Sequence, residues 1–305
     1  IFSGETEQFS LIRAETEQLK AQGQELFFEK LAAKNSWMDV QSKGQVHTAG
    51  DYPLQLELVY ACDVDGYGPI RGKGKLSGDL ARLGVQSALA EPQEVDLQGE
   101  VLDVLNELQW QALLKSPHLA LAAINDTWPA QVFDQVQIRG QGNIRNYDLE
   151  LDGRVVSKEL LRPLPLKSTL VVGWEGLVVQ ALRLTDTSGH LDLTGNLDWS
   201  PVLTWDANIT AEGINPDIIL ADLPGALSGK LSSQGSLTED RLNTEVKIDD
   251  LKGQLRGYAL TASGGAAYQD GALSVPGVHA AVGRTTLELK GTVQELQSNW
   301  QDQPD

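Results

Sequence analysis

Several features on which folds and active sites are commonly built are scarce in this sequence. Cys62 is the one cysteine in 305 residues, so an intramolecular disulfide framework is excluded and the cysteine count does not fix the compartment. The longest purely apolar run, Leu119–Ile124, is much shorter than the roughly 20 residues of a membrane-spanning helix. No initiating Met or signal peptide stands at Ile1, as we expect for a piece of a longer chain.

Positive charge is scarce too. The chain has 24 Lys and Arg against 42 Asp and Glu, which gives a formal net charge of −18. Nucleic acid selects for clustered Lys and Arg, so we predict that nucleic acid is not a partner. Adsorption to anionic lipid headgroups by charge alone is disfavoured for the same reason. We expect the acidic residues to serve solubility.

Residue patterns for catalysis or metal binding are also missing. The four histidines lie far apart in the sequence, without the spacing of a metal site: His47, His118, His190 and His279. Asp249 and Asp250 are expected on a solvated turn, and Gly140-x-Gly142 lacks the Lys-Ser/Thr of a phosphate-binding loop. We therefore predict that the chain is not an enzyme and has no catalytic residues, metal or cofactor.

Regular alternation of apolar and polar residues is what the sequence does contain. Residues 191–197 and 203–211 each place an apolar residue or glycine at every second position. Successive side chains of a strand point to opposite faces, so both stretches predict strands with one apolar and one polar face. Residues 53–60 predict another strand of this kind, and residues 242–248 a further one.

The alternating pattern repeats along the chain. The form apolar-x-apolar-x-Gly-x-apolar occurs around Gly99, Gly195 and Gly291, at intervals of 195 − 99 = 96 and 291 − 195 = 96 residues. A tryptophan follows each glycine at a similar distance: Trp110, Trp205 and Trp300. A second glycine-containing strand pattern lies between these, with Gly142 and Gly235 93 residues apart. We interpret the chain as about three copies of a unit of several antiparallel strands.

Three segments leave the secondary structure open. Residues 25–34 fit a short helix as well as a bulged strand. The apolar residues between Leu102 and Leu113 also fit a helical period. Residues 213–225 carry a turn at each end and are expected to hold at most one helical turn.

The glycines within the strands bear on the shape of the sheet. A glycine inside a strand allows a sharp bend or a close approach to the backbone. The sheet can therefore curl into a trough with an apolar concave face. Patterning alone favours, by a small margin, a closed sandwich core or the interior of a β-solenoid.

One longer motif carries a family resemblance. The pattern Asn215-Pro-x7-Pro224-Gly-Ala-Leu-Ser-Gly229 is followed by Leu231-x3-Gly235-x-Leu237. With the repeated Leu-x-Leu-x-Gly-x-Leu and the tryptophan beyond it, this resembles the periplasmic repeat region of the TamB family, the translocation and assembly module subunits of the AsmA-like group. The resemblance is clear over residues 130–300 and weaker over 1–129. We expect one elongated β-repeat region over 1–305, with a tail at 301–305.

The resemblance implies an all-β fold: an elongated, strongly curved antiparallel sheet, shaped like a taco, with few short helices. It implies a groove that conducts phospholipid acyl chains across the periplasm, in a protein anchored to the inner membrane at full length. It also implies an outer-membrane barrel partner of the TamA type, bound through regions absent here. The alternative function is a scaffold for outer-membrane protein and autotransporter assembly by β-augmentation. We further expect that two copies of this piece can pair groove to groove.

The resemblance transfers a groove-lining role to apolar residues of the predicted strands. The candidate lipid-binding residues are Leu54, Leu56, Leu58, Leu149, Leu151, Leu191, Leu193, Leu197, Leu203, Trp205, Ala207, Ile209, Leu242, Val246, Ile248, Leu287, Leu289 and Val293. Which face of each strand points into the groove is inferred from apolarity. The tryptophans could instead close a rim or an end of the groove.

Overall fold

The computed structural model describes residues 13–63, 66–128, 130–158, 160–218, 222–238 and 241–294. These residues form twenty β-strands, one α-helix and one 3-10 helix, so the predicted all-β class is confirmed. No helix among them is long and apolar enough to cross a membrane. The chain divides into two compact units, which are described separately. The first holds Ile1–Tyr147 and Gly153–Val155, and the second holds Asp148–Asp152 and Val156–Asp305.

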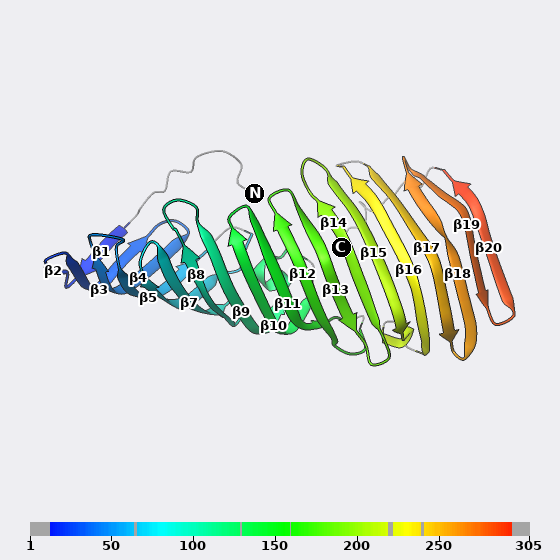
Figure 1. The fold of residues 1–305 in the computed structure, drawn as a ribbon, viewed down its shortest axis with the longest axis horizontal. Coiled ribbons are helices and arrows are strands. Elements are labelled where there is room, and N and C mark those ends of the chain that lie inside the picture. The colour runs from blue at the N-terminus through cyan, green and yellow to red at the C-terminus, as the bar shows by residue number, and fades with distance from the viewer. Residues whose placement is uncertain are drawn as a thin grey trace, which may run out of the picture. The chain divides into compact units, whose positions relative to one another are not determined.

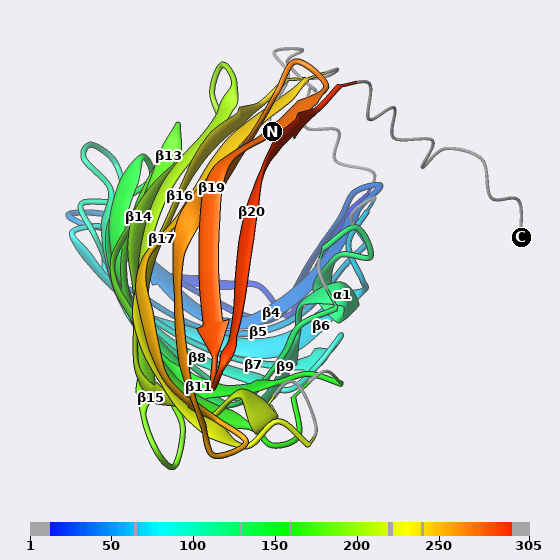
Figure 2. The same cartoon turned by 90° about the vertical axis from the view of Figure 1, so that its right-hand side faces the viewer.

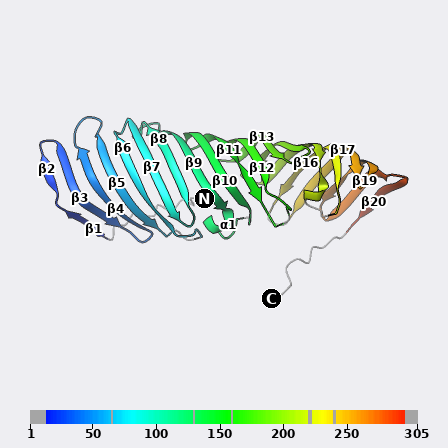
Figure 3. The same ribbon diagram turned by 90° about the horizontal axis from the view of Figure 1, so that it is seen from below.

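The first unit is an antiparallel sheet in which the strands from β3 to β10 follow chain order (Figures 1 and 3). Its strands are β1 (Arg13–Glu17), β2 (Lys20–Gln22), β3 (Glu25–Lys34), β4 (Met38–His47), β5 (Leu54–Cys62), β6 (Ile70–Gly78), β7 (Arg82–Glu91), β8 (Val95–Leu102), β9 (Gln109–Ala120) and β10 (Val132–Asn143). β1 and β2 both pair with β3, and the helix α1 (Leu121–Ile124) connects β9 to β10.

The second unit is also an antiparallel sheet in chain order. Its strands are β12 (Leu164–Gly173), β13 (Gly176–Thr185), β14 (His190–Asp198), β15 (Leu203–Ile214), β16 (Gly225–Leu237), β17 (Leu242–Leu255), β18 (Tyr258–Gln269), β19 (Ala272–Val282) and β20 (Thr285–Val293). The 3-10 helix η1 (Pro216–Ile218) lies between β15 and β16. Figure 2 shows that strands such as β17 and β19 bend along their length. β11 (Asn146–Val156) has residues in both units.

The segments that the sequence left open are now assigned. Residues 25–34 form a strand, with a register shift between Phe28 and Leu31 that marks the bulge. The helical alternative between Leu102 and Leu113 is wrong, because β8 ends at Leu102 and β9 begins at Gln109. Alternation over residues 109–114 and pairing with β8 override the helical period there. The single helical turn expected within residues 213–225 is confirmed as η1.

Burial in both sheets is shallow and one-sided. β5 shows the pattern: Leu54, Leu56 and Leu58 are half-buried, and the residues between them are exposed. Among the described residues, only six hydrophobic side chains are nearly buried, at 2–8% exposure: Val95, Leu119, Val136, Leu164, Leu166 and Ile218. Within each unit the described strands pack against their hydrogen-bonded neighbours, and no second sheet of the same unit lies on its apolar face. A closed sandwich interior is therefore not formed by the described residues.

The predicted repeat has a structural counterpart. Gly99, Gly195 and Gly291 lie in β8, β14 and β20, so each 96-residue interval contains six strands. In the first two copies the register is the same, because Trp110 pairs with Val101 and Trp205 pairs with Leu197. The third tryptophan, Trp300, and the tail at 301–305 lie outside the described residues. The single region over 1–305 stays a prediction.

Candidate apolar binding face

The apolar residues of the second unit form continuous rows across its strands. One row crosses eight neighbouring strands, from β13 to β20. Its members, each paired with the next, are Leu182, Leu193, Ile209, Leu231, Ile248, Gly264, Val278 and Leu289. Seven strand spacings make this row about 34 Å long. We call the side of the sheet that carries it the apolar face of the second unit.

The candidate residues of the second unit beyond β11 lie together on this face. Leu193, Ile209, Ile248 and Leu289 belong to the row just described. The others lie in parallel rows on the same side: Leu191, Leu197, Leu203, Trp205, Ala207, Leu242, Val246, Leu287 and Val293. Those of β14 and β15 are half-buried, whereas those of β20 are 51–61% exposed. Leu149 and Leu151 are half-buried residues of β11 that alternate with exposed acids.

Part of this face was not predicted from the alternation of apolar and polar residues in the sequence. Leu182 follows a register shift between Val179 and Leu182, and a similar shift lies between Ile248 and Leu251. A bulge adds a residue to one strand, so the residues on either side of it no longer share a simple two-residue period. The signal that was available is the run of adjacent apolar residues at 170–172 and at 177–179.

Trp205 lies on the apolar face. Its Nε1–H donates a hydrogen bond to Ser233 Oγ over 3.1 Å, and the ring extends over Gly235 of the next strand. A Cβ atom at Gly235 would lie 2.3 Å from Cζ2 of this ring, so only glycine leaves room for it. In the first unit Trp110 pairs with Gly142, and its Nε1–H donates to the carbonyl of Asn143 over 3.2 Å. Both described tryptophans of the repeat therefore pair with a glycine of the next strand.

We expect Trp205→Ala to lower the free energy of unfolding by about 2 kcal/mol, because it removes half-buried aromatic surface and leaves Gly235 uncovered. Trp174→Ala is the matched control: Trp174 is 68% exposed, and its change should stay within about 0.5 kcal/mol. Urea unfolding of both variants measures the difference. Equal loss in the two would contradict the packing described for Trp205.

The first unit carries an apolar face of the same kind. Leu58 pairs with Gly74 and Leu56 pairs with Leu76, so the candidates Leu54, Leu56 and Leu58 share one side of the sheet. Tyr60 lies on that side over Gly72, and its hydroxyl is 2.5 Å from Ser87 Oγ. Aromatic rings over glycines are thus found on the apolar faces of both units.

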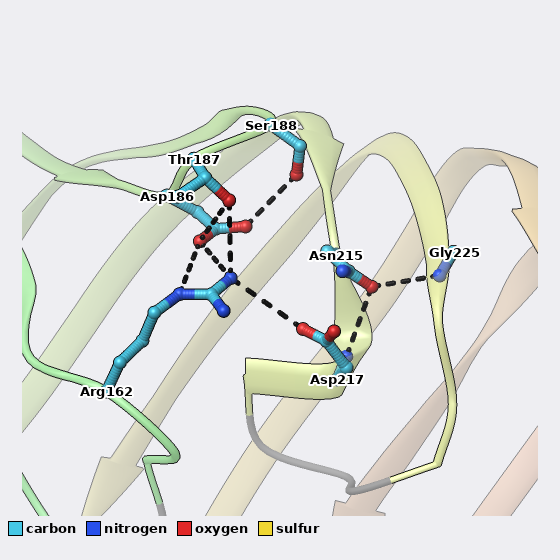
Figure 4. Close-up of polar contacts among 7 residues, drawn as sticks. All are labelled: Arg162, Asp186, Thr187, Ser188, Asn215, Asp217 and Gly225. Carbon is cyan, nitrogen blue, oxygen red and sulfur yellow. Dashed lines mark hydrogen bonds and ion pairs between the residues drawn. The ribbon is translucent and has the colours of Figure 1, made fainter.

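A polar cluster joins three loops at one edge of the second unit (Figure 4). Arg162 Nε donates to Asp186 Oδ1 over 3.1 Å, and its Nη2 lies 3.7 Å from Asp217 Oδ1. Ser188 Oγ donates to the other Asp186 oxygen over 3.0 Å. The side chain of Asp186 is 0% exposed. Burial raises the pKa of Asp186, but hydrogen bonds from Arg162, the Thr187 backbone N–H and Ser188 outweigh burial and hold the pKa below 3.8.

The pKa of Asp186 is lower in the folded protein than in the unfolded chain, so the charged carboxylate stabilises the fold at a pH above the pKa of the unfolded chain. This stabilisation is lost as the pH falls through the pKa of the folded protein. Asp186→Asn should therefore cost about 2 kcal/mol at pH 7 and progressively less below pH ~4. Thermal unfolding between pH 3 and 7 measures this. Asp206→Asn, at an exposed position of β15, should show no such convergence, and a constant gap for Asp186→Asn would contradict the assignment.

These features define a class: an antiparallel β-repeat protein whose sheets expose a wide apolar face that no second layer of described residues covers. The model of the family "TamB, N-terminal domain" matches residues 3–303. The chain therefore belongs to the TamB family. The match includes residues 3–129, where the resemblance read from the sequence was weaker.

A curated relative supports the same family. The chain is 24% identical over 284 residues to the translocation and assembly module subunit TamB of Haemophilus influenzae. The aligned region covers 89% of this chain and 21% of the relative, so the chain spans about a fifth of that protein. No solved structure matches the chain.

Proposed function

We propose that the apolar faces of this chain bind phospholipid acyl chains and serve as part of a lipid conduit between the inner and outer membranes. The observation that carries the proposal is the uncovered row of apolar residues from Leu182 to Leu289. A water-exposed apolar surface of this extent marks a binding site for an apolar ligand or a partner. Acyl chains would take the place of the missing second sheet.

The uniform composition of the face favours movement of an acyl chain along the row over tight binding at one position. The eight-member row holds leucine, isoleucine, valine and glycine and no polar side chain. Burial of an acyl chain stabilises the complex by about 25 cal/mol per Å² wherever the chain lies on such a row. Transfer along the row therefore meets no deep trap. The headgroup would stay in water, and the acidic polar face would keep the chain soluble.

The proposal also includes a setting for the full-length protein. In this proposal the full-length protein is anchored in the inner membrane, crosses the periplasm and acts with an outer-membrane barrel of the TamA type in the translocation and assembly module, supporting outer-membrane biogenesis. When the 305-residue chain is isolated, two copies would cover each other's apolar faces in the absence of lipid.

A second candidate is a scaffold that adds strands of outer-membrane proteins to a sheet edge. β20 favours it: within the described residues this strand pairs only with β19, and all nine of its residues are exposed. An edge strand of this kind presents unpaired backbone groups to an incoming strand. Proline substitutions in β20 would then impair function more than charges on the apolar face.

Native mass spectrometry of the purified chain, with extraction and identification of bound lipid, tests the proposal. It reports bound phospholipid and oligomeric state in one experiment. The conduit predicts phospholipid on the monomer and a dimer after delipidation. A lipid-free monomer from cells rich in phospholipid would contradict it.

A further inference from the structure

The polar side of the first unit contains a hollow that the lipid proposal does not use. It has a volume of about 850 Å³ and lies over β2 to β7. Cross-strand pairing places two rows along it. One runs Lys20, Phe27, Gln45, Gln55 and Ser77, and the other runs Lys43, Glu57, Lys75 and Gln86. These residues alternate with the leucines of β5 and β6, so the side chains of the rows lie on the face opposite to the apolar one.

The side chains of the two rows combine amides, ammonium groups and one aromatic ring. Three glutamines of the two rows each offer a planar amide that both donates and accepts hydrogen bonds. Glu57 is shared by two lysines: Lys43 Nζ lies 2.8 Å and Lys75 Nζ 3.7 Å from its carboxylate oxygens. The hollow holds three lysines against two glutamates, an excess of one positive charge in a chain whose net charge is −18. Phe27 is half-buried and is the one aromatic residue in an otherwise polar row.

Two classes of ligand fit this lining poorly. Acyl chains require the apolar face, which is on the other side of the sheet. An extended peptide gains affinity by pairing with a free strand edge. β3 to β7 are paired along both sides, and β2, which pairs only with β3 among the described residues, is three residues long and too short to hold an extended peptide.

We propose that this hollow binds an oligosaccharide that carries carboxylate groups. Sugar hydroxyls donate and accept like the glutamine amides, and the apolar face of a sugar ring packs on an aromatic side chain such as Phe27. The carboxylates of the glycan would pair with the excess ammonium charge. From Phe27 to Ser77 the first row crosses three strand spacings, about 14 Å, a length that several linked sugar rings can follow. The volume lies in the range of small-molecule binding sites.

The test is isothermal titration of the 305-residue chain with tetragalacturonic acid, and with chitotetraose as the neutral comparison. We expect the acidic sugar to bind more tightly, and Phe27→Ala with Gln55→Ala to weaken it at least tenfold. Gln111→Ala with Gln141→Ala is the matched control, since this pair lies on the polar side of β9 and β10, outside the hollow, and should leave binding unchanged. Thermal unfolding shows that each variant is folded.

Several results would overturn the proposal. These are no binding of tetragalacturonic acid, equal loss of binding in both double variants, or displacement of the sugar by an equal carboxylate concentration of acetate. Equal affinity for a polar decapeptide of glutamine and serine would assign the hollow to peptides instead. Phospholipid vesicles should not compete, because the two ligands would lie on opposite faces. The outcome is therefore independent of the lipid proposal.

Discussion

A chain with Leu193→Asp and Leu203→Asp should bind phospholipid about 100-fold more weakly than the unmodified chain, or more weakly still. Leu193 pairs with Ile209 and Leu203 with Leu237, so both side chains lie on the apolar face of the second unit. A charge held against hydrocarbon costs about 3 kcal/mol. Since 1.4 kcal/mol is a factor of ten, two charges exceed a 100-fold change. The lipid-to-protein ratio after purification, by extraction and mass spectrometry, measures the loss.

The variant should remain folded, because both leucines are only half-buried and water can reach an aspartate at either position. Thr194→Asp with Ser232→Asp is the matched control. Thr194 follows Leu193 on the polar face, and Ser232 pairs with Lys247, which offers the new carboxylate an opposite charge. This pair should keep its lipid. A folded Leu193→Asp, Leu203→Asp chain with the lipid content of the unmodified protein would rule out the conduit.

Gly195→Ala should lower the free energy of unfolding by roughly 3 kcal/mol, a large effect for one methyl group. A Cβ at Gly195 would lie 2.3 Å from the carbonyl oxygen of Asp206 and 3.0 Å from the Cα of Ala207. Both atoms belong to the backbone of β15, which cannot move aside as a flexible side chain would. The added methyl group would therefore force β14 and β15 apart.

Gly291 gives a control at the equivalent position of the next repeat. A Cβ there would meet no atom within 4 Å, so Gly291→Ala should change stability by less than about 0.5 kcal/mol. Denaturant unfolding of the two variants measures the contrast. Equal effects would show that Gly195 is not held in close contact with β15. The predicted role of this glycine in bringing strand backbones together depends on that contact.

Much of the fold could be read from local periodicity. Leu193 and Ile209 sit in unbroken alternation, and a strand with one apolar side follows directly from it. The repeated glycine and tryptophan positions also predicted a common unit, and Trp110 and Trp205 share their register. What the pattern could not supply was the position of each bulge, as at Val179 and Leu182. Bulges are set by pairing between strands rather than by the sequence of one strand.

The polar features depend on contacts between residues far apart in the chain. Arg162 and Asp186 come from different loops, and neither loop has a sequence motif from which their ion pair could be predicted. Phe27 and Gln55 line one hollow because β3, β4 and β5 pair in a particular register. Local sequence does not encode such register directly, because it follows from turn geometry and from burial of the whole apolar face.

Photocrosslinking with a phospholipid whose acyl chain carries a diazirine tests the central claim most directly. The account predicts crosslinks at alternate residues of β14 and β15, on Leu191, Leu193 and Ile209. It predicts none on the residues between them, such as Asp192, Thr194 and Asn208, which lie on the polar face. Mass spectrometry of the digested protein resolves these positions. Crosslinks spread equally over both faces, or confined to β20, would contradict an apolar face that carries lipid.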